Sequence, residues 1–90
     1  MEKRRVIVEP KVGLHARPAA LFVQTAMKAH AVVTVAKWNG APVNAKSILS
    51  VLGLDARHGD QITIAADGEG ADKVLDQLEA LVTAPEPGDG

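Results

Sequence analysis

Hydrophobic and polar residues alternate in several short segments of the chain, a pattern typical of β-strands. Alternation or β-branched composition predicts strands over residues 4–9, 32–38 and 61–66, with a short returning strand over residues 41–44. Asn39-Gly40 separates two of these segments. Both residues accept a positive φ, so the pair predicts a two-residue hairpin turn.

Apolar residues at helical spacing predict three helices. The spacing is clearest over residues 71–82, where an apolar stripe faces a charged side. Residues 19–27 follow Pro18, which a first helical turn tolerates, and they contain no helix breaker. Residues 46–54 predict a short helix that is apolar almost all round. The helices over residues 19–27 and 46–54 carry more apolar surface than one core-facing side requires, so part of it should face solvent or a partner.

These elements follow the order β-α-β-β-α-β-α. Four strands with helices on one face predict an α+β fold, an open-faced β-sandwich with a four-stranded antiparallel sheet and three helices on one face. The 90 residues suffice for one domain, which we place at residues 1–84, and residues 85–90 are expected to form a loose C-terminal tail. A chain of this size buries roughly 60% of its unfolded surface, so chemistry is expected at the surface rather than in a deep cleft.

Composition narrows the classes of partner. A net charge of −1 and only two aromatic residues provide little to hold a phosphate backbone or stack a base, so no nucleic acid is expected. The absence of cysteine excludes thiol catalysis. The N-terminal segment lacks a signal-peptide core and no stretch reaches membrane-spanning length, so we expect a soluble cytoplasmic protein. His30 and His58 are expected in surface loops, and neither a metal site nor a cofactor is predicted.

The segment Gly13-Leu14-His15-Ala16-Arg17-Pro18 carries the candidate chemistry. His15 lies where the loop meets the predicted helix, and the first amides of a helix, here Ala16 and Arg17, lack intrahelical partners and favour an anion. The guanidinium of Arg17 suits phosphate oxygens. The neutral imidazole is the nucleophilic form, and the helix dipole disfavours the imidazolium by about 0.3–1 kcal/mol. An isolated histidine at a helix start is usually a capping or surface residue, but the combined pattern fits phosphoryl transfer.

Two separate motifs resemble one protein family. Gly-Leu-His-Ala-Arg-Pro-Ala, residues 13–19, resembles the active-site signature of the HPr phosphocarriers of the bacterial phosphoenolpyruvate-dependent sugar phosphotransferase system. Lys-Ser-Ile-Leu-Ser-Val-Leu, residues 46–52, resembles the regulatory serine region of the same family. The order of elements also matches, and the resemblance covers roughly residues 3–82.

The resemblance implies a stoichiometric phosphocarrier rather than an enzyme, expected to be a monomer. His15 would accept a phosphoryl group on Nδ1 from enzyme I, itself charged by phosphoenolpyruvate, and pass it to sugar-specific enzyme IIA, while Arg17 pairs with the phosphoryl oxygens. Ser47 matches the serine that an HPr serine kinase/phosphorylase modifies in many Gram-positive members, where a catabolite regulator is a further partner. Ser47 fits a simple helix N-cap equally well.

The resemblance also implies that an apolar patch beside His15 docks both donor and acceptor. The predicted contacts are the small or apolar residues Ala20, Ile48, Leu49 and Leu52, with Gln24 and Met27 at the rim. Ordinary core packing is the alternative for this apolar surface, and it is expected for Leu21, Val51 and Leu54.

Three other functions stay open. A purely regulatory relative can lack the histidine, a nitrogen-linked relative typically differs at the serine segment, and a small ligand-binding module would need a pocket. The chain also departs from the family pattern at Val12, where many members carry a small polar residue. Asp55, Asp60 and Asp67 are interpreted as turn residues rather than paired catalytic carboxylates.

Overall fold

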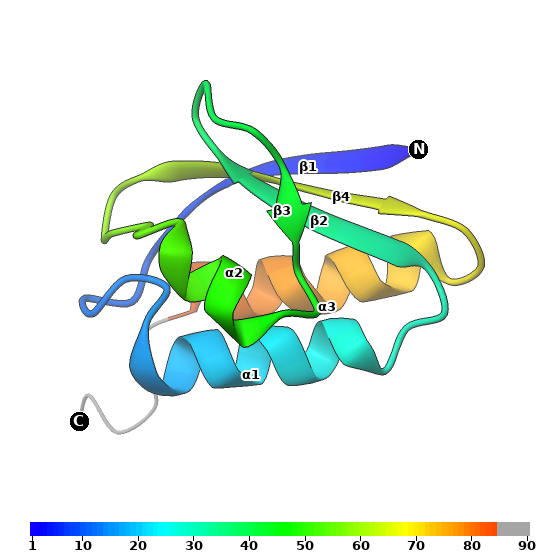
Figure 1. Cartoon of the computed structure of the whole chain (residues 1–90), viewed down its shortest axis with the longest axis horizontal. Coiled ribbons are helices and arrows are strands. Elements are labelled where there is room, and N and C mark those ends of the chain that lie inside the picture. Colours follow the sequence, from blue (N-terminus) through cyan, green and yellow to red (C-terminus); the bar gives the residue numbers. More distant parts are fainter. Residues whose placement is uncertain (85–90) are drawn as a thin grey trace.

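The computed structural model describes residues 1–84, and the predicted C-terminal tail lies outside the described residues. Along the chain the elements are β1 (Glu2–Ile7), α1 (Ala16–Met27), β2 (Val32–Lys37), β3 (Val43–Asn44), α2 (Ile48–Gly53), β4 (Gln61–Asp67) and α3 (Ala71–Thr83). The predicted order is confirmed. The three helices cover one face of a four-stranded sheet and leave the other face open, as expected for an open-faced α+β sandwich (Figure 1).

The sheet has the strand order β1-β4-β2-β3, and every neighbouring pair is antiparallel. β4 is therefore a central strand. Its alternating residues Ile62 and Ile64 are fully buried, with Ile62 paired to Val6 on β1 and Ile64 paired to Val35 on β2. The period-two pattern thus gathers the apolar side chains on the face that the helices cover.

Helices α1 and α3 close the core over this face (Figure 1). Phe22 on α1 is fully buried, and so are Leu75 and Leu78 on α3. At the surface, Arg4 on β1 donates from Nη1 to Asp76 at 2.8 Å and to Glu79 at 2.9 Å on α3. These contacts, first Asp76 and then Glu79, raise the pKa of the Arg4 guanidinium above its ordinary value.

The predicted two-residue turn at Asn39-Gly40 is wrong. Asn39 has a φ of 63°, but Gly40 does not take a positive φ, as such a turn requires of both residues. β2 and β3 pair at Thr34↔Asn44 and Val35↔Val43, so the hairpin is centred on Asn39. Its loop therefore has an odd number of residues and not two. β3 is shorter than predicted, since Pro42 offers no N–H to the ladder.

Among the other boundaries that differ from the predictions, two shifts have identifiable reasons. Strand β1 ends two residues before the predicted limit, because the Val8 amide donates to Asp60 O at 2.9 Å and the Glu9 amide donates to Val82 O at 2.9 Å. Helix α1 begins at Ala16 rather than after Pro18, which falls inside the first turn, where a missing N–H costs nothing.

Within residues 1–84 no helix is both long and apolar enough to cross a bilayer.

We expect Phe22→Ala to lower the free energy of unfolding by about 3–5 kcal/mol, because it empties a fully buried site between α1 and the sheet. Leu49→Ala is the matched control. Leu49 is 80% exposed, so its removal should change stability by no more than about 0.5 kcal/mol. Urea denaturation of both variants measures this, and equal losses would contradict the placement of Phe22 at the centre of the core.

Candidate functional site

The loop before α1 is held directly against the loop after α2. The Leu14 amide donates to Ala56 O at 2.8 Å, and the Leu14 side chain is buried in the core. Gly13 makes this approach possible. Its φ is +73°, and a Cβ placed on it would lie 2.5 Å from Ala56 O. The residue that follows Leu14, His15, is thereby brought to a defined place beside the second loop.

His15 is the N-cap residue of α1, with an extended backbone and no side-chain capping hydrogen bond. Its side chain is 35% exposed. The Ala19 amide donates to His15 O, whereas the amides of Ala16 and Arg17 donate to no acceptor in the described part of the chain. His15 thus directly precedes two free N–H groups at the positive end of the helix dipole, and such a helix start stabilises an anion.

The residue directly after His15 has an unusual backbone. Ala16 has a φ of 51°, in the left-handed region, which costs a residue with a Cβ about 1–2 kcal/mol. The core anchor Leu14 lies on one side of His15 and the helix begins on the other, so the chain must turn sharply over two residues. Strain of this kind is frequent at functional sites, and here it lies beside the candidate nucleophile.

His15 contacts an acidic residue from the other loop. Its Nε2 lies 3.1 Å from Asp55 Oδ1, across 40 positions of sequence. The other carboxylate oxygen, Oδ2, accepts hydrogen bonds from Arg57 Nε at 3.2 Å and Nη2 at 3.0 Å. Arg57, and secondly His15, hold the pKa of Asp55 below its ordinary value, so the carboxyl group is ionised at neutral pH. Asp55 lies in the loop after α2, as the turn interpretation expected, but its contact with His15 was not predicted.

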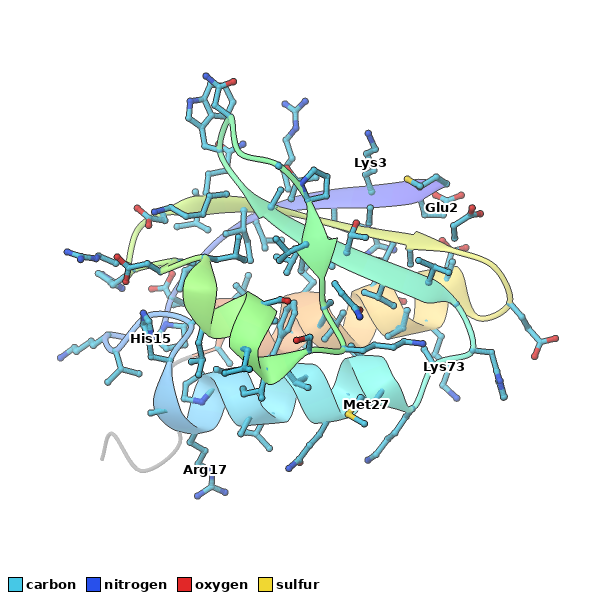
Figure 2. The ribbon with its side chains drawn as sticks, viewed as in Figure 1. Glu2, Lys3, His15, Arg17, Met27 and Lys73 are labelled. Carbon is cyan, nitrogen blue, oxygen red and sulfur yellow. The ribbon has the colours of Figure 1, made fainter. Side chains whose placement is uncertain are left out.

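The second predicted side chain, Arg17, is not brought to His15. In Figure 2 the Arg17 side chain extends into solvent from the outer side of α1, away from the His15 ring. It is exposed and, among the residues that the structure describes, forms no hydrogen bond or ion pair. Contact between its guanidinium and a group on His15 would require rotation of the Arg17 side chain.

Ser47 is the N-cap residue of α2, as the capping interpretation expected. Its Oγ accepts a hydrogen bond from the Ser50 amide at 3.3 Å. The side chain is half-buried. The structure therefore accounts for a serine at this position by its local contact, and modification of Ser47 stays a prediction.

The predicted docking residues lie on the adjoining helices α1 and α2 (Figure 1). Leu49 is 80% exposed, whereas Val51 on the opposite side of α2 is fully buried. Among the other predicted docking residues, Ala20 is half-buried. The remaining ones are exposed: Gln24, Met27, Ile48 and Leu52. The helix that appeared apolar all round thus buries a single residue and presents the remainder at the surface.

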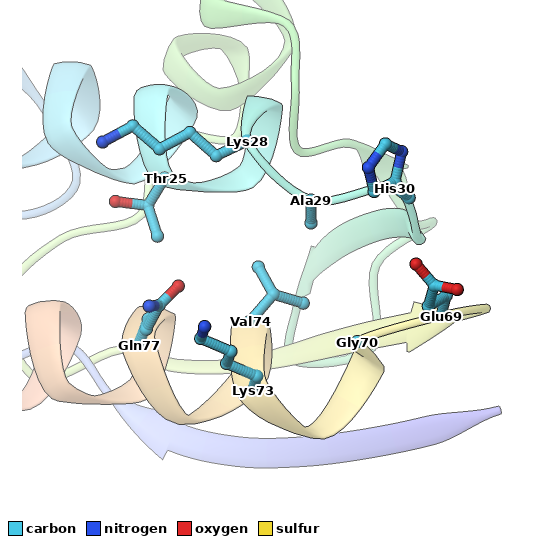
Figure 3. A pocket seen from close by; sticks show the side chains of 9 residues that line it. All are labelled: Thr25, Lys28, Ala29, His30, Glu69, Gly70, Lys73, Val74 and Gln77. Carbon is cyan, nitrogen blue, oxygen red and sulfur yellow. The ribbon is translucent and has the colours of Figure 1, made fainter.

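A hollow of about 390 Å³ lies between the end of α1 and the start of α3 (Figure 3). Lys28, His30, Lys73 and Glu69 are among its lining side chains. It is remote from His15, which lies at the opposite end of α1 (Figure 2), and none of the predicted site residues lines it. Within the described residues, no group of three or more histidine or carboxylate side chains could hold a metal ion.

Comparison with known proteins decides the family. A family model for the phosphorylation site of the HPr component of the phosphotransferase system matches residues 2–84. The chain belongs to this HPr family. The family resemblance that the two sequence motifs indicated is thereby confirmed.

Individual HPr relatives agree over nearly the whole chain. Phosphocarrier protein HPr of Streptomyces coelicolor is 51% identical over 82 residues, which cover 91% of this chain and 88% of the relative. The HPr-like protein Crh of Bacillus subtilis is 43% identical over 82 residues, or 91% and 95% of the two chains. The crystal structure of phosphocarrier protein HPr from Bacillus anthracis matches with a TM-score of 0.86 at 46% identity, covering 90% of this chain and 95% of that one.

We expect Gly13→Ala to destabilise this HPr domain more than Gly59→Ala. Both glycines have a positive φ, so both variants lose about 1–2 kcal/mol, but a Cβ at Gly59 meets nothing within 4 Å. At Gly13 the added Cβ meets Ala56 O, which adds about 1–3 kcal/mol for overpacking. Chemical denaturation gives both values. Equal destabilisation would show that the two loops do not approach as closely as described.

Proposed function

We propose that this chain is a phosphocarrier in which His15 accepts a phosphoryl group on Nδ1 from enzyme I and delivers it to sugar-specific enzyme IIA. The observation that carries the proposal is the place of the ring. It is partly exposed and belongs to the N-cap residue of α1, directly before the free amides of Ala16 and Arg17, in a chain of the HPr family. The contact with Asp55 engages Nε2 and leaves Nδ1 for the phosphoryl group.

The chemistry needs positioning and charge stabilisation more than proton transfer. The Nδ1 lone pair forms the N–P bond while the bond from phosphorus to the donor's leaving atom breaks, and that electron pair stays with the donor. The product phosphate is stabilised by the two amides and by the helix dipole. Rotation would bring the Arg17 guanidinium to the phosphoryl oxygens. The carrier is restored when the group moves on, so it is stoichiometric rather than an independent enzyme.

Docking of both partners to one surface fits the exposed apolar residues of α1 and α2. The residues proposed to dock, defined here as the docking patch, are Ala20, Gln24, Met27, Ile48, Leu49 and Leu52. A shared patch beside His15 makes docking of donor and acceptor mutually exclusive, which suits a carrier that dissociates between the two. A carrier charged from phosphoenolpyruvate would act in the cytoplasm, which is the location we propose.

Regulation through Ser47 is a second candidate function, favoured by the similarity to Crh of Bacillus subtilis, which a solved structure describes as a catabolite repression protein. Phosphorylation would add about −1.5 to −2 charges at the start of α2. The Ser50 amide, which now donates to Ser47 Oγ, would remain close to the phosphoserine, so the start of α2 would persist. The charge would lie beside the apolar docking patch and hinder its desolvation. An HPr serine kinase/phosphorylase and a catabolite regulator are the corresponding proposed partners.

Incubation with purified enzyme I and phosphoenolpyruvate should add one acid-labile phosphate to the chain, and His15→Ala should abolish it. Intact-mass measurement before and after acid treatment gives the result. His58→Ala is the control, because His58 is exposed, its Nδ1 lies 2.8 Å from Glu9 O, and it lies outside the proposed site. Undiminished phosphate in the His15 variant would overturn the assignment.

Leu49→Ala should raise the KM for enzyme I about fivefold or more while leaving stability unchanged, because an exposed apolar anchor is lost. Val32→Ala serves as the control, since Val32 is 66% exposed at the start of β2, outside the docking patch. Steady-state kinetics of enzyme I with each variant as acceptor measures the difference. Equal KM values for the two variants would contradict docking at α2.

A further inference from the structure

We infer that Asp55 is a positioning residue for phosphoryl transfer, holding the His15 ring with its proton on Nε2 so that Nδ1 presents a lone pair to phosphorus. The inference rests on the proposed function of His15. It starts from the 3.1 Å contact between His15 Nε2 and Asp55 Oδ1, which joins the two loops through their side chains as well as their backbones.

The contact determines which ring nitrogen carries the proton. An ionised carboxylate only accepts hydrogen bonds, so Nε2 must be the donor to Asp55 Oδ1. A neutral imidazole has a single N–H, and Nδ1 of His15 is therefore left with its lone pair. A carboxylate that fixes the tautomer and direction of an imidazole is a recurring device in sites where histidine exchanges groups or protons.

Asp55 is itself held on several sides. Arg57 donates two hydrogen bonds to Oδ2, so Oδ1 remains for His15. The Arg57 amide donates to Asp60 Oδ2 at 2.8 Å, which closes the loop behind the carboxylate. Lys37 Nζ donates to Asp55 O at 3.3 Å and lies 3.6 Å from Asp60 Oδ2. These contacts limit the movement of a carboxylate that would otherwise be free in solvent.

The backbone of Asp55 gives an independent reason to assign a role to its side chain. Its φ is +52°, in the left-handed region that glycine occupies without strain. The turn alone therefore does not require a side chain here. The strained position instead directs a carboxylate at the proposed nucleophile, and an outlier of this kind is a basis for a functional hypothesis.

The same contact assists transfer in both directions. When the Nδ1 lone pair forms the N–P bond and the donor keeps the electron pair of the broken bond, Nε2 retains its proton and the ring gains positive charge. That charge lies beside the Asp55 carboxylate. In onward transfer the electron pair of the N–P bond returns to Nδ1 and the ring becomes neutral again. A docked partner excludes water and strengthens the interaction.

Asp55→Gly tests the inference, because glycine relieves the backbone strain while removing the carboxylate. We expect ¹⁵N NMR of the ring nitrogens to show only the Nε2–H tautomer in the native protein and an added Nδ1–H fraction in the variant. Single-turnover transfer from enzyme I charged with phosphoenolpyruvate should slow about 2- to 12-fold, as expected for one lost hydrogen bond. Thermal stability should be unchanged or higher, which separates positioning from a structural role.

Two further variants complete the test. Arg57→Gln should change the tautomer fraction and the transfer rate in the same direction as Asp55→Gly but by less. Asp55 is still present in this variant and has lost only its guanidinium partner. Asp67→Asn, at the end of β4, should leave both quantities at native values. Native tautomer and native rate in Asp55→Gly would overturn the inference. If native His15 accepted no phosphoryl group, the proposed function would fail, while the tautomer measurement would still decide the role of the contact.

Discussion

The close approach of two loops is the constraint on which the site depends. The Leu14 amide reaches Ala56 O at 2.8 Å only because Gly13 has no side chain to obstruct it. This single backbone contact sets the beginning of α1 and the path of the loop after α2. His15 and Asp55 meet as a consequence, although 40 positions separate them. The electrostatics of the proposed site therefore follow from a steric condition at one glycine.

The layered fold explains why such a small chain can perform group transfer. Its sheet and two longer helices supply a core around fully buried Phe22, and α2 contributes only Val51 to it. The remaining apolar surface of α2 stays accessible next to the start of α1. We infer from this exposed surface that the carrier provides the nucleophile and the amides that stabilise an anion, while each proposed partner encloses the reaction. A shallow site suits the proposal that the same surface docks two different proteins.

Sequence periodicity predicted the parts of the fold that depend on local pattern. Alternation placed β4 within one residue of its observed end, and the apolar stripe located α3. The turn at Asn39-Gly40 was wrong because the register is set by pairing at Thr34 and Val35, not by turn preference alone. Asp55 was missed as a contact of His15 because nothing near it in sequence indicates that contact. It arises from the approach of Gly13 to Ala56, which only the assembled fold reveals.

The position of phosphorus on the charged protein tests the central claim most directly. Heteronuclear NMR of ¹⁵N-labelled protein, loaded by enzyme I and phosphoenolpyruvate, detects coupling between ³¹P and a single ring nitrogen. We predict coupling to Nδ1 of His15, with a proton still bound to Nε2. Phosphorus on Nε2, or on any other residue, would contradict the account.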